Sequence, residues 1–315
     1  NMQPPQSLQK VFEKTPEGVF RDYSLKINNT WYVGGKASYA YFPESRNSLI
    51  DFFRKSFFEE TPWSVLGGGS NVLISDRGFP GCIVFTEKLN KMVLLPSSSP
   101  EKECIYADAG VSLAHLLKFS LHHSLSGLEF GIGIPGSLGG ALMGNAGTQG
   151  QCIGNLVEYV DLLFSDARVR RIATKEILWK YRFSSLSEIP CILLGCVLAF
   201  RKETKEVLKK NLRFFAAKRK GQPFLRRTAG SVFKNPEGNF AGKLLDASGC
   251  KGIICGGARV SLEHANFIEN YHEASSQDIL ELIYLCREKV KEHTGISLYP
   301  EVRFVGFEDS EILFT

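Results

Sequence analysis

Two separate glycine-rich segments constrain this chain more than any other feature of its sequence. The first, Gly67-Gly68-Gly69-Ser70-Asn71, follows a short predicted strand at 63–66, and the second runs from Gly131 to Gly147. Five of the ten residues from Gly131 to Gly140 are glycine, a density that suits neither a helix nor an ordinary strand. Such loops leave backbone N–H groups free for a phosphate, or let the backbone pack on a flat ligand or another backbone.

The first segment has neither the spacing of a Rossmann GxGxxG nor that of a Walker A loop, so it supports neither assignment. A tight turn that needs only a positive φ would explain one such loop. Two of them favour a large dinucleotide that carries a ring system.

The composition is that of a globular chain with an ample core. Of the 315 residues, 43% are hydrophobic and 23% charged, which fits about two domains and argues against disorder. No apolar stretch approaches the roughly 20 residues that cross a bilayer, and the N-terminal residues do not resemble a signal peptide. We therefore expect a cytoplasmic protein without membrane insertion. The eight cysteines form no CxxC pair, so we expect free thiols and no metal site.

Strand and helix signals are interleaved along the chain, which indicates an α/β or α+β protein. We expect helices at 48–58, 113–122 and 175–180, strands at 157–164 and 191–200, a loop at 97–100 and a hinge at 201–210. The clearest helix begins after Ser275, which forms a capping box with Asp278, and ends at Gly295. A strand is expected at 297–305, with Glu301 and Arg303 on one face as a solvated ion pair.

Three further features each have a structural and a functional interpretation. Ser231, in Gly230-Ser231-Val232-Phe233-Lys234-Asn235-Pro236, is either a turn hydroxyl or an exposed reactive one, and the GxSxG spacing of a nucleophile elbow is absent. His264 is either a structural histidine or part of a site. The basic run from Lys209 to Arg227 is a solvated helix face or a site for a diphosphate or 2′-phosphate, whereas the net charge of +5 gives RNA binding little support.

Taken together and in order, these segments resemble the UDP-N-acetylenolpyruvoylglucosamine reductase family, in its compact second type. The resemblance runs from about Asn29 to Arg303. Its specific elements are Leu66–Leu73, Gly133–Gly147, Tyr181-Arg182-Phe183-Ser184, Gly230–Pro236, Ala241–Gly252 with Gly256–Asn270, and Pro300-Glu301-Val302-Arg303.

The resemblance implies an α+β fold with a two-lobed FAD-binding domain of the vanillyl-alcohol-oxidase (PCMH) type at 30–201. Its lobes would span about 30–95 and 101–201, and an α+β substrate domain would span 204–315. It implies non-covalent FAD, NADPH as hydride donor and UDP-N-acetylglucosamine enolpyruvate as substrate, in peptidoglycan synthesis. It further implies a monomer that binds no nucleic acid.

The same resemblance assigns roles to individual residues. Arg182 would stabilise negative charge on the substrate carboxylate, Ser231 would protonate the α-carbon, and Glu301 would act beside that carboxylate if burial raises its pKa. The residues expected to bind FAD are Gly67, Gly68, Gly69, Ser70, Asn71, Ile134, Pro135, Gly136, Ser137, Gly139, Gly140, Asn145 and Gly147. Those expected to bind substrate are Tyr181, Gln222, Lys234, Asn235 and His264.

The chain departs from the family pattern at two places, and two other functions remain open. Thr148-Gln149-Gly150 stands where the family usually has Ala-Tyr-Gly, and Gly144 where it has a bulky apolar residue. The first alternative is another flavin-dependent oxidoreductase of the same fold, with O₂ as oxidant. The second is a catalytically silent flavin- or nucleotide-binding module, against which the presence of Arg182, Ser231 and Glu301 argues.

Overall fold

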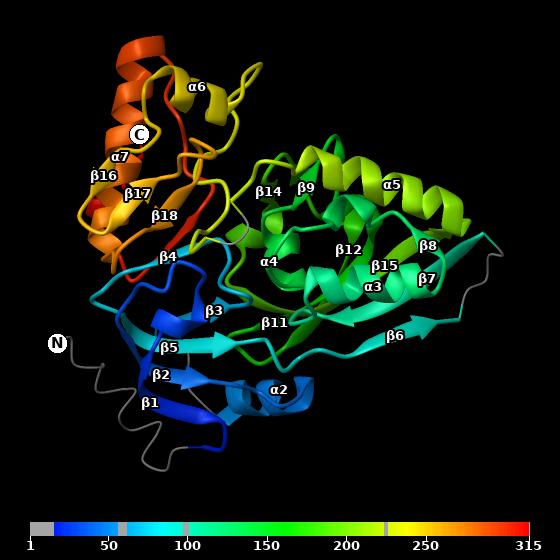
Figure 1. Cartoon of the computed structure of the whole chain (residues 1–315). Helices are drawn as coiled ribbons and strands as arrows, with labels where there is room; N and C mark the ends of the chain where they lie inside the picture. The colour runs from blue at the N-terminus through cyan, green and yellow to red at the C-terminus, as the bar shows by residue number, and fades with distance from the viewer. Residues whose placement is uncertain (1–15, 56–61, 97–100, 224–225, 315) are drawn as a thin grey trace.

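The computed structural model describes residues 16–55, 62–96, 101–223 and 226–314, and the account below concerns these residues. Three bodies are visible in Figure 1: an N-terminal lobe in blue and cyan, a second lobe in green, and a C-terminal domain in yellow to red. Among the described residues, no helix is both long enough and apolar enough to pass through a membrane. The eight cysteines are free thiols.

The first lobe is built on a four-stranded sheet with the order β1-β2-β5-β3. Its strands are β1 (Val19–Ser24), β2 (Lys36–Tyr41), β3 (Trp63–Leu66) and β5 (Phe79–Phe85), and the 3₁₀ turn η1 (Lys26–Asn28) precedes β2. The helix α2 (Arg46–Lys55) covers one face with Leu49, Phe52 and Phe53. The helix predicted at 48–58 is thus confirmed as far as Lys55, and residues 56–58 lie outside the described part of the chain.

The second lobe has a larger sheet with the order β12-β11-β15-β7-β6, to which β8 adds at β15. Its strands are β6 (Met92–Leu95), β7 (Lys102–Asp108), β8 (Leu125–Ser126), β11 (Val157–Phe164), β12 (Val169–Ala173) and β15 (Cys191–Lys202). Because β6 pairs with β7, this lobe begins before the loop predicted at 97–100, which itself lies outside the described residues.

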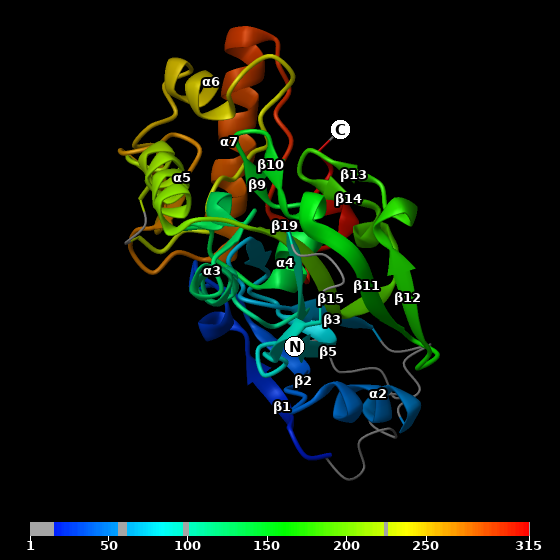
Figure 2. The ribbon, with the colours of Figure 1, turned by 90° about the vertical axis from the view of Figure 1, so that its right-hand side faces the viewer.

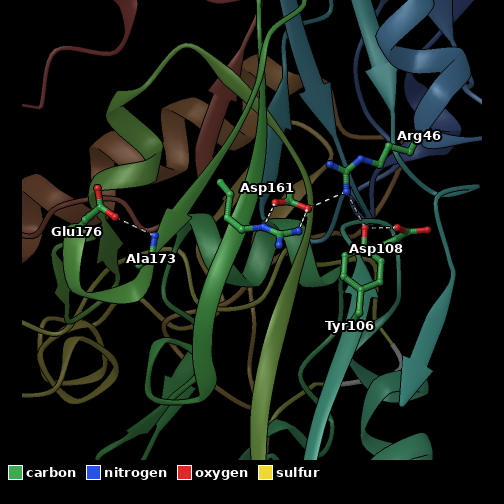
Figure 3. A network of polar contacts seen from close by, with 7 residues as sticks. Arg46, Tyr106, Asp108, Asp161, Ala173 and Glu176 are labelled. Atoms are coloured by element: carbon green, nitrogen blue, oxygen red, sulfur yellow. Dashed lines mark hydrogen bonds and ion pairs between the residues drawn. The ribbon is translucent and has the colours of Figure 1, made fainter. Parts of the chain in front are cut away.

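Helices, short turns and two small hairpins complete the second lobe. They are α3 (Leu113–His122), α4 (Leu138–Met143), the 3₁₀ turns η2 (Glu129–Gly131), η3 (Ile153–Leu156), η4 (Thr174–Glu176) and η5 (Ser185–Glu188), and the hairpins β9–β10 (Gly147–Thr148, Gln151–Cys152) and β13–β14 (Trp179–Lys180, Phe183–Ser184). The helix expected at 113–122 is confirmed. The helix expected at 175–180 is wrong: η4 ends at Glu176, whose carboxylate accepts a hydrogen bond from the Ala173 N–H at 3.2 Å, and the chain continues as β13 (Figure 3).

The helix α5 (Lys205–Lys218) follows β15 and packs against the second lobe. Phe215 belongs to the buried cluster of that lobe, and the Asn211 amide donates to the Glu129 carboxylate at 3.0 Å. The segment expected to be a hinge at 201–210 therefore consists of the end of β15 and the start of α5. We find α5 on the second lobe, although the predicted domain boundary assigns it to the C-terminal domain.

The C-terminal domain combines a three-stranded sheet with two helices. The sheet is β16 (Ile254–Cys255), β17 (Ala258–Val260) and β18 (Ile268–Asn270), and the helices are α6 (Ala241–Ala247) and α7 (Ser276–Thr294). The predicted capping box of α7 is confirmed, since Ser275 Oγ accepts from the Asp278 N–H at 3.0 Å and Asp278 accepts from the Ser275 N–H at 2.9 Å. Gly295 ends the helix at φ 73°.

Only part of the strand expected at 297–305 is regular. β19 covers Arg303–Val305 and is followed by the 3₁₀ turn η6 (Asp309–Glu311). Pro300, which has no N–H to donate, makes only an isolated bridge with Phe233.

The C-terminal domain is fixed to the first lobe. β19 pairs in parallel with β4 (Val72–Ile74), and the fully buried Trp31 donates its Nε1–H to the Ile268 carbonyl at 2.7 Å. Asp76 accepts from the Ser276 N–H at 2.7 Å, at the start of α7. Trp31, Val33 and Leu73 of the first lobe share one hydrophobic cluster with the C-terminal domain.

A buried ionic contact joins the two lobes to each other. The Asp161 carboxylate on β11 is 1% exposed and lies 2.8 Å from Arg46 of α2 and 2.8 Å from Arg171 of β12 (Figure 3). Burial raises the pKa of Asp161, but the two arginines outweigh that effect and hold its pKa below the usual value. This ionic contact thus holds the two lobes together. The candidate site described below lies where both lobes approach the C-terminal domain.

Candidate active site

The two glycine-rich segments pack directly on one another. A Cβ at Gly67 would lie 2.1 Å from Ser137 Oγ, one at Gly68 would lie 2.9 Å from Gly136 Cα, and one at Gly136 would lie 2.6 Å from Ser70 Oγ. At Gly68 the nearest atom is backbone, so a side chain there would push the two segments apart. At Gly67 and Gly136 the nearest atom is a serine hydroxyl, which a side chain would displace. One segment follows β3 in the first lobe and the other precedes α4 in the second, so their contact lies between the lobes.

Several N–H groups at this contact are free to bind an anion. Among the described residues, the N–H groups of Gly68, Gly69, Ser70 and Asn71 find no protein acceptor, and neither do those of Gly136 and Ser137. Gly69 has φ +59°, and a Cβ there would lie 1.9 Å from the Asn28 carbonyl oxygen. Unpaired backbone N–H groups in adjoining glycine loops are the groups that bind a pyrophosphate in proteins. These residues therefore fit the diphosphate of a dinucleotide.

In the rest of the second glycine segment, some residues are exposed to solvent and others are hydrogen-bonded to the protein. Gly133, Pro135 and Gly140 are exposed and Ile134 is half-buried. On the anchored side, the Gly139 N–H donates to the Ala109 carbonyl at 2.8 Å, and Ser137 Oγ accepts from the Gly140 N–H at 3.3 Å. The segment thus presents a surface of small residues on which a flat ring can lie.

Asn145 holds the second segment to the neighbouring hairpin. It has φ 45° and is buried, its amide donates to the Lys180 carbonyl at 2.9 Å, and its Oδ1 accepts from the Gly154 N–H at 3.0 Å. Both ends of this side chain are therefore engaged by protein backbone. Asn145 positions the β13–β14 turn, where Arg182 lies.

Arg182 occupies a constrained position at that turn. Its φ is 52°, which is uncommon for a residue with a side chain, and its guanidinium donates to the Gly147 carbonyl at 2.8 Å. The guanidinium carbon also lies 5.3 Å from the centre of the Tyr181 ring. Backbone strain of this kind is a feature of functional sites.

Glu301 of the C-terminal domain pairs with Arg182. Arg182 Nε lies 2.7 Å from Glu301 Oε1, and the two side chains are 24% and 19% exposed. The partner expected from the sequence, Arg303, does not form this pair. Figure 2 labels the β13–β14 hairpin, whose turn contains Arg182, and β19, which follows Glu301.

Burial raises the pKa of Glu301 above its usual value, and the positive charges of Arg182 and Lys234 offset this only in part. A carboxyl group needs a raised pKa if it is to stay protonated and donate a hydrogen bond.

Ser231 lies beside Glu301 through main-chain pairing. The Glu301 N–H donates to the Val232 carbonyl at 2.7 Å, and Phe233 bridges Pro300. Asn71 of the first glycine segment joins the same place, because its amide donates to the Glu301 carbonyl at 3.1 Å. The structure therefore brings Asn71 of the first glycine segment, Glu301 and the backbone next to Ser231 to one location.

Asn266 fixes the segment that contains Ser231, and the sequence analysis does not identify it. Its backbone carbonyl accepts from the Val232 N–H at 2.9 Å, its Oδ1 from the Phe233 N–H at 2.9 Å, and its amide donates to the Phe233 carbonyl at 2.9 Å. The residue pattern could not reveal this, because Asn266 lies 33 positions from Phe233 in sequence.

A cavity of about 360 Å³ opens beside Tyr181. It is lined by Tyr181, Lys234, Asn235, Pro236, Ser297, Leu298 and Tyr299. The Tyr181 hydroxyl accepts from the Asn235 N–H at 3.3 Å, and Asn235 Oδ1 accepts from the Ala241 N–H at 3.0 Å, at the start of α6. Three of the predicted substrate residues, Tyr181, Lys234 and Asn235, thus line one cavity formed by the second lobe and the C-terminal domain.

The two other predicted substrate residues have different surroundings. The buried Gln222 Oε1 has no hydrogen-bond partner among the described residues, and the Gln222 N–H donates to the Arg219 carbonyl at 3.2 Å. His264 packs on Gly242 of α6, accepts from the Asn266 N–H at 3.2 Å, and burial lowers its pKa. We find His264 supporting Asn266 rather than lining the cavity.

Arg219 is a further cation that the sequence analysis does not single out. It directly follows α5, and burial together with the nearby charge of Arg182 lowers its pKa. The basic run at Lys209–Arg227 therefore divides: Arg219 belongs to the surroundings of Arg182, whereas most cations of α5 face outward.

Comparison with known proteins agrees with this geometry. Residues 37–173 match the family model described as an FAD binding domain, so the fold and the site define an FAD-dependent oxidoreductase. Residues 222–305 match the model of the UDP-N-acetylenolpyruvoylglucosamine reductase C-terminal domain.

Relatives extend the match over most of the chain. UDP-N-acetylenolpyruvoylglucosamine reductases from Streptococcus pneumoniae strains JJA and P1031 are each 37% identical over 293 residues, 92% of this chain and 95% of the relative. The crystal structure of the UDP-N-acetylenolpyruvylglucosamine reductase from Thermus caldophilus is 32% identical, with a TM-score of 0.75, over 91% of this chain and 98% of that chain. The chain belongs to the UDP-N-acetylenolpyruvoylglucosamine reductase family.

Proposed function

We propose how the residues of this chain carry out the reaction of its family, the NADPH-dependent reduction of UDP-N-acetylglucosamine enolpyruvate to UDP-N-acetylmuramate in peptidoglycan biosynthesis. The observation that carries the proposal is the convergence of Arg182, Glu301 and the Ser231 segment beside the glycine cradle. A module that only binds a nucleotide needs the glycines but has no use for this cluster.

The glycine cradle would hold FAD. The N–H groups of Gly68–Asn71, Gly136 and Ser137 would bind its pyrophosphate, and Ile134–Gly140 would lie along its ring system. FAD held there would supply the hydride chemistry that links NADPH to the enol-ether β-carbon of the sugar. The side chains of this chain would do the rest.

Arg182 would stabilise the negative charge that develops on the substrate carboxylate during reduction. Its guanidinium is already fixed by the Gly147 carbonyl and by the backbone of the β13–β14 turn. A donor that is oriented before the reaction stabilises the transition state without a further cost of reorganisation.

Ser231 would donate the proton that the α-carbon requires. A serine hydroxyl is a weak acid, so its contribution depends on position, which Asn266 enforces through Val232 and Phe233. A positioned proton donor typically contributes about 10²–10⁴-fold to the rate.

Glu301 would act in its protonated form. The substrate carboxylate would bring a second negative charge next to Glu301. Because the pKa of Glu301 is raised, Glu301 would take up a proton and would not repel the substrate carboxylate. Protonated Glu301 then donates a hydrogen bond, and Arg182 is released from the ion pair to bind the substrate.

The cavity beside Tyr181 would hold part of the UDP-sugar, with Lys234 opposing its negative charge. Gln222 would offer its unpaired Oε1 to a sugar or uracil N–H or O–H group. We further propose that the chain is of the compact second type and acts in the cytoplasm as a monomer. Light scattering after size-exclusion chromatography tests the monomeric state.

Isotope labelling of the product tests the reaction as a whole. In D₂O with ordinary NADPH, we expect deuterium on both the α-carbon and the former β-carbon of the product, because a hydrogen carried between NADPH and the sugar on a nitrogen exchanges with solvent. With NADPH deuterated on the transferred position in H₂O, we expect slower NADPH oxidation and little deuterium in the product. NADPH oxidation that depends on O₂ and leaves the sugar unchanged would instead indicate another oxidoreductase of the same fold, and the absence of turnover would indicate a silent module.

A further inference from the structure

The outer side of α5 is strongly basic and has no role in the site described above. Five cations of this helix are exposed, and the helix contains one acidic residue, Glu206. Among the described residues, none of the five cations forms an ion pair. We name them the α5 basic face: Lys205, Lys209, Lys210, Arg213 and Lys218.

Apolar side chains are exposed within this face. Phe214 is 50% exposed and Val207 is 38% exposed, and they lie two turns apart on the same side of the helix. Lys218 Nζ lies 5.4 Å from the centre of the Phe214 ring. The opposite side of α5 is the one that packs, through Leu208 and Phe215.

An exposed phenylalanine flanked by unpaired cations is suited to a particular partner. A bilayer rich in anionic lipid attracts the cations and accepts the apolar ring between its headgroups. The helix is about 21 Å long from its 14 residues, and it runs across the surface of the molecule (Figure 1). Its exposed side is therefore long enough for several cations to contact a bilayer at once.

We propose that the α5 basic face binds the anionic surface of a phospholipid bilayer. The inference does not depend on the proposed catalytic roles. Arg219, which follows the helix, turns toward Arg182, so the site and the α5 basic face are separate parts of the basic run. Binding would thus place the enzyme at the membrane surface and leave the active-site residues uncovered.

Nucleic acid is the other polyanion that such a face can attract, and it fits less well. A helix that binds nucleic acid directs polar donors at phosphates and base edges. Here Val207, Phe214 and Ala217 lie among the cations of the exposed side.

Vesicle flotation with the FAD-loaded full chain tests the proposal. We expect binding to vesicles of equal parts phosphatidylglycerol and phosphatidylcholine at low salt, and none to pure phosphatidylcholine. Each cation at such a surface contributes about fivefold to binding, so Lys209→Gln, Lys210→Gln and Arg213→Gln together should weaken it on the order of 100-fold. Phe214→Ala should weaken it several-fold at unchanged net charge.

A matched control separates the face from net charge. Arg168→Gln, Arg170→Gln and Lys175→Gln remove the same charge from exposed positions just before, on and just after β12, and should leave vesicle binding within about twofold. Flavin absorbance and reductase activity should be unchanged in both triple variants, which shows that they fold. Equal losses in the two variants would overturn the proposal. So would no binding to the anionic vesicles, or binding to poly(U) RNA in their place.

Discussion

Arg182 Nε and Glu301 Oε1 lie 2.7 Å apart, although one belongs to the second lobe and the other to the C-terminal domain. The C-terminal domain is fixed mainly to the first lobe, through β4–β19 and Trp31. The Arg182–Glu301 ion pair therefore connects the C-terminal domain to the second lobe as well. It makes the catalytic geometry depend on how the second lobe meets the C-terminal domain.

The raised pKa of Glu301 predicts a pH dependence of stability. Below the usual value of 4.5 the carboxyl is protonated in both the folded and the unfolded protein. As the pH rises from 4.5 through the folded-state pKa, the unfolded protein loses its proton first, so stability falls. Glu301→Gln removes this titration, and its Tm should decline less over that window. An identical decline in the two proteins would show that Glu301 has no raised pKa.

Glu129 should behave in the opposite way. Burial raises its pKa, but hydrogen bonds from Asn211, Gly127 and Ser126 outweigh burial and lower it overall. Its contribution is thus present above 4.5 and lost as the pH falls through the folded-state value.

Urea unfolding measures this contribution. At pH 7 we expect Glu129→Gln to lose about 1–3 kcal/mol, and a smaller amount at pH 3. The exposed Glu237→Gln is the control and should unfold like the wild type at both values. A loss from Glu129→Gln that is equal at the two pH values would contradict the electrostatic explanation.

The packing of the glycine segments predicts a specific loss of cofactor. In Gly67→Ala the new methyl group would lie 2.1 Å from Ser137 Oγ and 3.2 Å from Ser137 Cβ, so the hydroxyl that caps α4 must move and the second loop is disturbed. We expect the purified variant to have lost most of its flavin absorbance at 450 nm. Gly131→Ala is the matched control, because its Cβ would meet only Leu128 side-chain atoms at 3.5 Å. Full flavin content in Gly67→Ala would rule out the cradle.

Arg219 should contribute to substrate binding through its charge. Removing it in Arg219→Gln takes away a buried cation next to Arg182, and we expect the KM for the UDP-sugar to rise about tenfold, or about 1.4 kcal/mol. Reduction of the flavin by NADPH should continue at its normal rate. The neighbouring exposed Lys220→Gln should have an unchanged KM, and equal effects in the two variants would point to a general effect of charge.

The sequence predicts local features well and long-range partners poorly. The α7 helix followed from Ser275, Asp278 and Gly295, because capping depends on residues a few positions apart. The pairing of Glu301 with Arg182, in contrast, results from the docking of one domain on another. No spacing along the chain distinguishes Arg182 from Arg303 as the partner.

The same limit applies to the supporting asparagines. Asn145 and Asn266 hold the loops that contain Arg182 and Ser231, but their value depends on backbone groups that only the fold brings near. The helix expected at 175–180 failed for a local reason. The Glu176 side chain turns back to the Ala173 N–H, which makes a single 3₁₀ turn, and Trp179 starts a hairpin.

One anaerobic experiment tests the central claim, that Ser231, Arg182 and Glu301 serve the sugar half-reaction of a flavin reductase. NADPH is added to the purified protein and then UDP-N-acetylglucosamine enolpyruvate, while the flavin absorbance is followed in wild type and Ser231→Ala. We expect NADPH to bleach both proteins equally. The sugar should restore the wild-type colour quickly and that of Ser231→Ala about 10²–10⁴-fold more slowly. Equal rates of return would contradict the role of Ser231, and a wild-type flavin that stays bleached would contradict the assigned substrate.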